Sequence, residues 1–273
     1  MKIEQQVAAH YTQGMLEQRI LGALQTAGKT LEQLHADDLA PVDDFHVGGR
    51  EATQALADFM GLRPGMHLLD VGCGIGGPAR YFTKRGCQVT GVDLSEEFIR
   101  VAASLTRLVK LHENATFRQA SALELPFDSD TFDGAYEIHV GMNIADKAGV
   151  FKEVARVLKR GARFAIFDIM RAGEGVLKFP LPWALSPETS FVASPEEYRQ
   201  ALQAAGFGID HQRGRRQFAI EFMQRMMTRA ASERPVLGVH LLMGEQTGAM
   251  LQNVMAAIAS GLLEPIELVA IAE

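Results

Sequence analysis

The sequence is poor in the features that mark secreted and membrane-spanning proteins. Its 273 residues include only two cysteines and one tryptophan, and no apolar run approaches the roughly 20 residues that a membrane helix needs. Two cysteines leave no disulfide framework to propose and suit a reducing compartment. The first residues, MKIEQQVAAHYTQG, lack the basic and apolar stretches of a secretion signal. We therefore expect a cytoplasmic protein that does not insert into a membrane.

The sequence also has fewer basic than acidic residues. Lys and Arg number 27 against 33 Asp and Glu, a formal charge of −6 at pH 7, and no basic tract occurs. Nucleic-acid surfaces need clustered cations, so we expect a small-molecule partner instead. No group of His, Cys and Asp residues has metal-ligand spacing, and we expect no metal. The sequence leaves open whether the chain forms a homodimer.

The sequence does have the composition of one elaborated α/β domain, with 47% hydrophobic and 22% charged residues. Helical patterns separate short apolar segments, and one helix, expected to end at Gly161, carries apolar residues at helical spacing up to Leu158. This alternation implies right-handed βαβ units and a parallel sheet. Strands are expected at 67–71, 88–93, 115–119, 132–136, 163–169 and 265–272.

The segments that flank this alternating region are mainly helical. Helices are expected before Gly28 and at 51–60, 217–230 and 244–261. We expect a single domain over residues 1–273 with three parts. These are an N-terminal helical lid segment (1–60), a cofactor-binding core (61–172), and a substrate cap with closing strands (173–273).

A glycine-rich loop follows the first expected strand. Gly72, Gly74 and Gly77 satisfy G-x-G-x-x-G, a pattern that fits NAD enzymes and S-adenosylmethionine (SAM) enzymes alike. Asp70 discriminates between them, because a carboxylate there repels a pyrophosphate and attracts the ammonium of the SAM methionine tail. The alternative is that Asp70 only accepts hydrogen bonds from loop amides. The loop therefore favours SAM.

Two further loops are placed to hold the nucleoside. Asp93 ends the second expected strand, about 20 residues beyond the glycine loop, where an acid can accept both ribose hydroxyls. It could instead cap the following helix, although Ser95 already occupies a capping position. After the third strand, Ser121, Ala122 and Leu123 fall where a loop should meet the adenine.

At this point the sequence resembles the class I SAM-dependent methyltransferases. The resemblance implies a Rossmann-like, doubly wound, mostly parallel sheet of seven strands with the last antiparallel, N-terminal helices, and a helical insert near the C-terminus. It implies SAM as cofactor, S-adenosylhomocysteine (SAH) as product and a small-molecule methyl acceptor. It covers roughly residues 45–172 and rests on LLDVGCGIGGPARYF, VTGVDLSEEFI, ALELPFDSDTFDGAY and EVARVLKRGARFAI, in that order. A looser likeness to methyltransferases of the sarcosine/dimethylglycine and ubiquinone/menaquinone-methylating type rests on FHVGGREAT, MNIADK and PLPWA.

The resemblance also implies which residues contact the cofactor. The sequence departs from the family at Ser121, where the family often has an aspartate that binds the adenine amino group. A serine hydroxyl accepts that hydrogen bond as a weaker, neutral partner. The implied contacts are Asp70, Gly72, Cys73, Gly74, Gly76, Asp93, Leu94, Ser121, Ala122, Leu123 and Glu137.

Methyl transfer from a sulfonium is an in-line displacement, for which the protein supplies alignment and exclusion of water. A hydroxyl acceptor would need a base within hydrogen-bond reach, whereas a neutral amine or an activated carbon would not. We expect His139 and Glu137, at the end of the fourth strand, to be the catalytic candidates. Each candidate has simple packing as its alternative role. Candidate acceptor contacts are Tyr11, His46, His139, Asn143 and Trp183.

Two other functions share parts of this pattern. An NAD-dependent dehydrogenase is disfavoured by Asp70 and by the lack of a second nucleotide-binding half. A protein with this fold that binds SAM without transferring its methyl group, as a binding module or a non-methylating catalyst, would carry the same cofactor motifs. Formation of SAH from SAM separates these readings.

Overall fold

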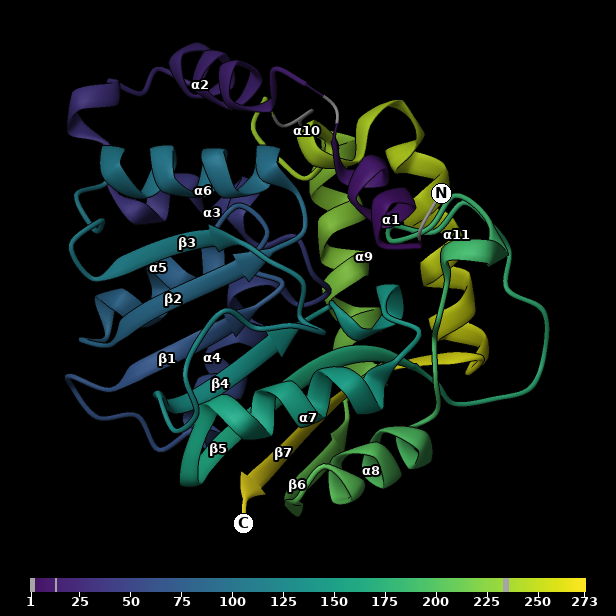
Figure 1. Ribbon diagram of the computed structural model, residues 1–273. Helices are drawn as coiled ribbons and strands as arrows, with labels where there is room; N and C mark the ends of the chain where they lie inside the picture. The colour runs from purple at the N-terminus through teal and green to yellow at the C-terminus, as the bar shows by residue number, and fades with distance from the viewer. Residues whose placement is uncertain (1–2, 13, 233–235) are drawn as a thin grey trace.

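A computed structural model describes residues 3–12, 14–232 and 236–273 of the chain. One sheet contains β1 (His67–Val71), β2 (Gln88–Asp93), β3 (Ala115–Gln119), β4 (Phe132–Ile138), β5 (Leu158–Arg171), β6 (Phe207–Gly214) and β7 (Leu263–Ala272). The strand order is β3-β2-β1-β4-β5-β7-β6. Strands β1 to β5 pair in parallel, and β7 runs antiparallel to its neighbours β5 and β6 (Figure 1). The predicted mostly parallel sheet with an antiparallel last strand is confirmed.

Helices cover both faces of the sheet and fill the long connections. The α-helices are α1 (Ile3–Tyr11), α2 (Leu16–Thr26), α3 (Ala40–Asp43), α4 (Gly49–Phe59), α5 (Gly77–Lys84), α6 (Glu96–Leu108), α7 (Lys147–Val157), α8 (Pro195–Ala204), α9 (Arg216–Ser232), α10 (His240–Met243) and α11 (Thr247–Ser260). Short 3-10 helices lie at Leu31–Gln33, Ala36–Leu39, Gly141–Asn143, Pro187–Thr189 and Gly244–Gln246. The helices α1 to α4 precede the sheet, and α9 to α11 lie between β6 and β7, as the predicted N-terminal helices and C-terminal insert require.

Strand β1 illustrates how the sheet is held between two helical layers. Successive side chains of a strand point to opposite faces, so Leu68 and Leu69 face different layers. Leu68 packs in a cluster with residues of α4 and α5, while Leu69 packs in a cluster with residues of α7 and α8. Figure 1 shows α7 and α8 in front of the sheet. Both leucines are fully buried, and each contributes about 1.5–3 kcal/mol of transfer free energy. Burial on both faces explains why this strand is continuously apolar.

Local signals fix several element ends. Ser95 caps α6, because its hydroxyl accepts a hydrogen bond from the Phe98 amide at 3.2 Å, as predicted. The helix predicted to run to Gly161 ends earlier, since α7 stops at Val157 and Leu158 opens β5 opposite Phe132. Leu158 is buried by this pairing, so contacts with the sheet outweigh its helical spacing.

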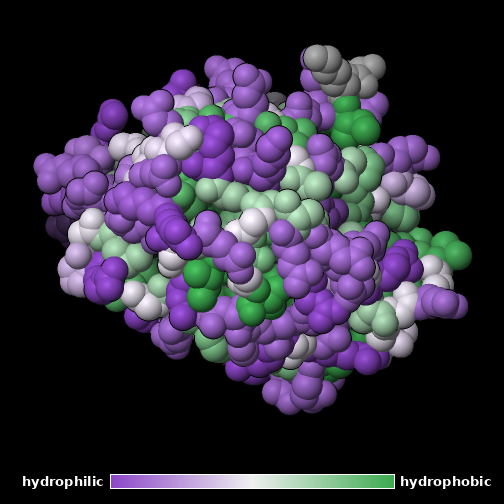
Figure 2. Space-filling view, turned by 60° about the horizontal axis from the view of Figure 1, so that its bottom comes forward, coloured by the Kyte–Doolittle hydropathy of each residue, from purple (hydrophilic) through white to green (hydrophobic). Residues whose placement is uncertain are grey.

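The outer surface is mixed. The face seen in Figure 2 is largely hydrophilic, with hydrophobic residues in separate patches. Most large apolar side chains of the described residues lie in the clusters on the two faces of the sheet and around the helical insert. Among the described helices none has the length and apolar character that crossing a bilayer requires.

Candidate functional site

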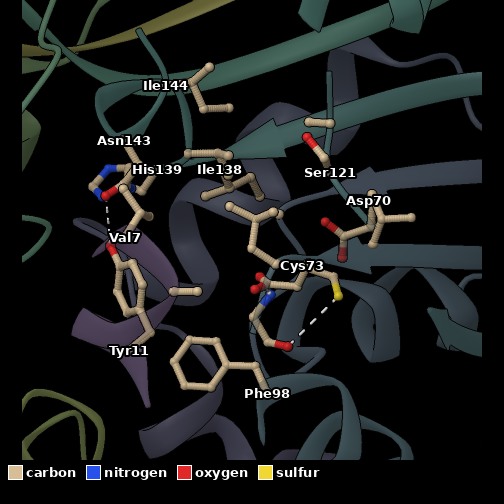
Figure 3. Close-up of a pocket in the computed structure, with 18 of the residues that line it drawn as sticks. Val7, Tyr11, Asp70, Cys73, Phe98, Ser121, Ile138, His139, Asn143 and Ile144 are labelled. Atoms are coloured by element: carbon tan, nitrogen blue, oxygen red, sulfur yellow. Dashed lines mark hydrogen bonds between the residues drawn. The ribbon is translucent and has the colours of Figure 1, made fainter. Parts of the chain in front are cut away.

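A cavity of about 290 Å³ opens at the carboxyl ends of β1 to β4. This volume is at the lower end of the range of about 300–1,000 Å³ for small-molecule sites. The strand order reverses here, because β1 is followed in space by β2 on one side and β4 on the other. Open α/β sheets bind ligands at such a point. Its lining includes residues of α1, the segment 43–46, the glycine loop, the ends of β2, β3 and β4, and Leu242 (Figure 3).

The glycine loop forms one wall. Gly72 has φ +69°, and a Cβ there would lie 2.5 Å from the Val140 side chain, so both the backbone and the contact require glycine. Gly74 has φ +52°, and its amide donates to the Asp93 carboxylate at 2.9 Å. Gly72, Cys73 and Gly74 line the cavity, whereas Gly76 lies behind it at the start of α5.

Asp70, near the end of β1, contributes a buried carboxyl group whose hydrogen bonds are incomplete. Its carboxyl is buried and lines the cavity, and its Oδ2 has no hydrogen-bond partner among the described residues. Burial raises the pKa of Asp70 to about 8. A cationic group in the cavity would supply the missing partner and favour the ionised form. The site therefore fits a ligand that brings an ammonium to this position.

Asp93 connects the glycine loop to the next helix. Its Oδ2 accepts from the Gly74 amide and its Oδ1 from the Ser95 amide, both at 2.9 Å. Burial raises its pKa above the ordinary value. Each carboxylate oxygen retains a second lone pair for a ligand hydroxyl. Asp93 thus contacts the helix start, as its alternative role requires, and lines the cavity together with Leu94.

The loop after β3 meets the N-terminal helix. Ser121, Ala122 and Leu123 all line the cavity. The Ser121 hydroxyl donates to the Glu4 carboxylate of α1 and accepts from the Leu123 amide at 3.1 Å. Sequence reasoning did not single out Glu4, because nothing in MKIEQQ marks a residue that reaches a loop more than 100 residues away.

Helix α1 lies across the opening of the cavity. The Tyr11 hydroxyl donates to Asn143 Oδ1 at 3.2 Å, and His10 Nε2 lies 3.1 Å from the carbonyl oxygen of Pro182 (Figure 3). The turn after α1 is held by Glu97, whose carboxylate accepts from the amides of Gly14 and Leu16. Tyr11 and Asn143, both predicted acceptor contacts, are therefore brought together.

His46 and His139 are neighbours in the cavity lining, with their rings edge to face and the ring centroids 5.9 Å apart. His46 Nε2 lies 2.9 Å from the Gly49 carbonyl oxygen, an acceptor, so that nitrogen carries the proton and Nδ1 keeps its lone pair. His139 has φ +57° and its backbone amide donates to the Phe167 carbonyl oxygen at 2.8 Å, but its buried Nε2 has no hydrogen-bond partner among the described residues. Burial lowers the pKa of His46 to about 4 and holds that of His139 well below its ordinary value. Both rings are neutral at pH 7.

Two predicted site residues lie elsewhere. Trp183 does not line the cavity. Its ring is buried beside α9 and α11, and its Nε1 donates to Ser190 at 3.0 Å. The Glu137 side chain is also outside the lining, because Ile138 and His139 occupy the cavity side of this strand end. Trp183 is therefore a packing anchor in this structure, and neither Trp183 nor Glu137 lies in the cavity lining, so their contact with a ligand stays a prediction.

Glu137 lies instead beside a buried support for the cavity wall. Asp168 accepts hydrogen bonds from the Val140 and Gly141 amides at 2.8 and 2.9 Å and from the Tyr198 hydroxyl at 2.8 Å. Burial raises the pKa of Asp168 above its ordinary value although the three donors favour its charged form, and burial together with the neighbouring Asp168 raises the pKa of Glu137 well above its ordinary value. The arrangement holds the loop that presents His139 and Asn143.

A buried ion pair fixes the segment that precedes α4. Arg80 of α5 donates through Nε to Asp43 Oδ2 at 3.1 Å, and its Nη2 also bonds Asp43. Both side chains are 1% exposed. Arg80 further donates to Thr106 and to the Ile75 carbonyl oxygen. Asp43 is thereby held against Gly77, and the following residues, Phe45 and His46, are directed into the cavity.

Comparisons with known proteins agree with this architecture. Residues 69–166 match the family model described as methyltransferase domain. Cycloartenol-C-24-methyltransferase 1 of Oryza sativa is 40% identical over 114 residues, which are 41% of this chain and 33% of that protein. Methyltransferase GfsG of Streptomyces halstedii is 34% identical over 50% of this chain and 49% of its own length. The chain thus spans a third to a half of these curated relatives.

A solved structure shares nearly the whole fold. The structure of the [4+2]-cyclase SpnF superposes with a TM-score of 0.67 and 21% identity over 95% of both chains. At this identity the likeness concerns the fold alone. The matched family model and the related sequences agree with the predicted resemblance: residues 69–166 of this chain are similar to a methyltransferase domain, and the fold is one that it shares with SpnF.

Proposed function

We propose that the chain binds SAM in this cavity and transfers its methyl group to a small organic acceptor. The observation that carries the proposal is the convergence of Asp70, Asp93 and the 121–123 loop on one cavity at the carboxyl ends of adjacent strands. The unpartnered Asp70 Oδ2 suits the methionine ammonium, and Asp93 suits the ribose hydroxyls. SAM, when bound, supplies a methyl group activated by its sulfonium.

The acceptor would bind on the side of the cavity formed by α1 and the end of β4. His46, His139 and Asn143 are the polar groups there, and Figure 3 shows His139 and Asn143 on the side of Tyr11. The neutral imidazoles can accept a hydrogen bond from the acceptor, and their lowered pKa makes them weak bases, which favours an acceptor that needs no strong base. None of the described lining residues is a lysine or arginine, which favours an uncharged acceptor over a phosphorylated one or a nucleic acid.

The alternative function, SAM binding without methyl transfer, remains a second proposal because the fold alone does not require methyl transfer. The neighbouring structure SpnF is titled a [4+2]-cyclase, and it shares 95% of this chain's length. A non-methylating catalyst or SAM-binding module would use the same cofactor contacts, and would differ only in leaving SAM unconsumed.

Calorimetry followed by turnover tests the proposal. We expect SAM and SAH to bind with one ligand per chain and NAD and NADP to give no heat, because a pyrophosphate would lie against Asp70. Incubation with SAM and a set of small uncharged alcohols, phenols and amines should then produce SAH, detected by mass spectrometry. Tight binding of NAD would overturn the cofactor assignment, and SAM binding without SAH formation on any acceptor would favour the non-methylating alternative.

We further propose that residues 1–60 act as a lid and residues 173–273 as the cap that completes the acceptor pocket. The support is that α1 crosses the cavity, while His10 bonds the Pro182 carbonyl oxygen of the Pro-rich loop, itself tied to α11 by Asn253 at 3.0 Å. Closure would exclude water and align the acceptor.

Hydrogen exchange measures this lid directly. On adding SAH, amides of α1 and part of the 178–195 segment should exchange more slowly, while β1 and β4 stay protected in both states. Identical exchange in both states, together with full turnover after deletion of α1, would assign acceptor binding to the sheet core alone.

A further inference from the structure

The 121–123 loop carries Ser121 where the family resemblance implies an aspartate beside the adenine. In the structure, the carboxylate of Glu4 lies next to this serine. Ser121 lies two residues beyond Gln119, the β3 partner of Asp93, so it follows the expected ribose site along the sheet edge. Figure 3 shows Ser121 on the same side of the pocket as Asp70, across from Tyr11. The base of a nucleoside whose ribose meets Asp93 would therefore extend toward Ser121.

The Ser121 hydroxyl has little capacity left for a ligand. It donates its single proton to Glu4 Oε1 and accepts from the Leu123 amide at 3.1 Å. A hydroxyl has one donor and two acceptor lone pairs, and its bond to Leu123 fixes the loop rather than a ligand. An exocyclic amino group needs an acceptor, and Ser121 offers at best one neutral lone pair.

Glu4 is the better acceptor at this position. It is partly buried, lines the cavity, and is held in place by Ser121 through only one of its oxygens. Its Oε2 makes no hydrogen bond to a described residue, so it keeps both lone pairs. The side chain belongs to the fourth residue of the sequence, on a helix anchored at its far end by Glu97.

We infer that Glu4 supplies the carboxylate that accepts a hydrogen bond from the adenine 6-amino group of the cofactor, with Ser121 acting as the residue that positions it. The inference rests on the proposed SAM function. It makes α1 part of the cofactor site as well as a cover for the acceptor, so cofactor binding itself would draw the helix onto the cavity.

A carboxylate at this point also sets specificity. It accepts from an amino group, and it repels the carbonyl oxygen that replaces this group in a 6-oxo purine. A site built on such an acceptor rejects the analogue that cannot donate, because buried polar groups are left unpaired. The chain should therefore distinguish SAH from its 6-oxo analogue.

Binding of these two ligands to the full chain, measured by calorimetry without any acceptor, tests the inference. The wild-type chain should bind SAH at least about 10-fold more tightly than the 6-oxo analogue. Glu4→Gln should weaken SAH binding by about 10-fold and remove the preference, since an amide can both donate and accept. Adding Ser121→Asp to Glu4→Gln should restore the preference, because the acid then comes from the loop.

Gln6→Ala is the matched control, because Gln6 is exposed on the same helix and outside the cavity lining. It should leave both affinities at wild-type values, whereas a general loosening of α1 would weaken both ligands equally in all variants. A Glu4→Gln chain that keeps the wild-type preference for the amino group overturns the inference, as does a wild-type chain that binds SAH without any preference. A wild-type chain that binds no SAH refutes the proposed function instead.

Discussion

Replacing Asp93 by alanine should raise the dissociation constant of SAH roughly 10- to 150-fold, while the chain stays folded. A hydrogen bond to a charged group contributes about 1.5–3 kcal/mol, which corresponds to that range. Asp93 would lose its contacts to the ribose, and the Gly74 amide would lose the acceptor that holds the glycine loop. The effect should therefore appear in binding of SAM and SAH alike, because both carry the same ribose.

Calorimetry of the variant against SAH measures this change, and circular dichroism checks the fold. Asp58→Ala is the matched control, because Asp58 is exposed on α4 and outside the cavity lining. A dissociation constant for Asp93→Ala equal to that of the control would reduce Asp93 to a residue that only starts α6.

The second large effect is expected on stability. Arg80→Met should lower the free energy of unfolding by about 3–5 kcal/mol, because it leaves Asp43 buried without its partner. Burial already raises the pKa of Asp43 to about 6 with Arg80 present. Removing the cation should raise the folded-state pKa further, while Asp43 is ionised in the unfolded chain at both pH values. The loss of stability should therefore be larger at pH 8, where folding must protonate the carboxyl or bury its charge unpaired, than at pH 5.

Urea unfolding at the two pH values measures this loss. Arg107→Met is the control, since Arg107 is exposed on α6. The double variant Asp43→Leu with Arg80→Met should recover part of the stability, because an apolar pair carries no desolvation penalty. If the single and double variants are equally unstable, packing of the Arg80 stem is responsible instead of the charge.

The parts of the fold that were predictable are those with strong local signals. The segments 67–71, 88–93 and 115–119 match β1, β2 and β3. Strand β1 is a short, largely buried apolar run that a glycine loop ends, whereas the edge strand β3 is mostly exposed and was placed by the spacing of strands and helices. Strand β6 was missed. Its sequence, FGIDHQRG, shows neither a continuous apolar run nor a clean alternation, since it lies at the edge of the sheet and most of its residues are partly or fully exposed.

The candidate site divides in the same way. Asp70 and Asp93 lie at the carboxyl ends of β1 and β2, and Ser121 lies two residues beyond β3, so sequence order alone assigns them to one sheet edge. Glu4 and Asp43 lie in segments that precede the alternating strands and helices. Only their contacts with Ser121 and Arg80 in the folded chain show that they reach the cavity. Trp183 packs in a buried cluster beside the helices and does not line the cavity, a position that the sequence could not decide because an aromatic residue in a Pro-rich loop has the same local pattern whether it faces a ligand or packs on helices.

The position of β7 has a consequence for the order of events during synthesis. Strand β6 pairs only with β7, yet the 48 residues 215–262, including three helices, are translated between them. A nascent chain that has produced β1 to β6 therefore carries an open edge on β5 and an isolated β6 with no strand to join. Unpaired edges of this kind attract other chains. The ribosome-bound chain should thus be most prone to aggregation after β6 emerges. This tendency should end when β7 pairs with β5 on one side and with β6 on the other.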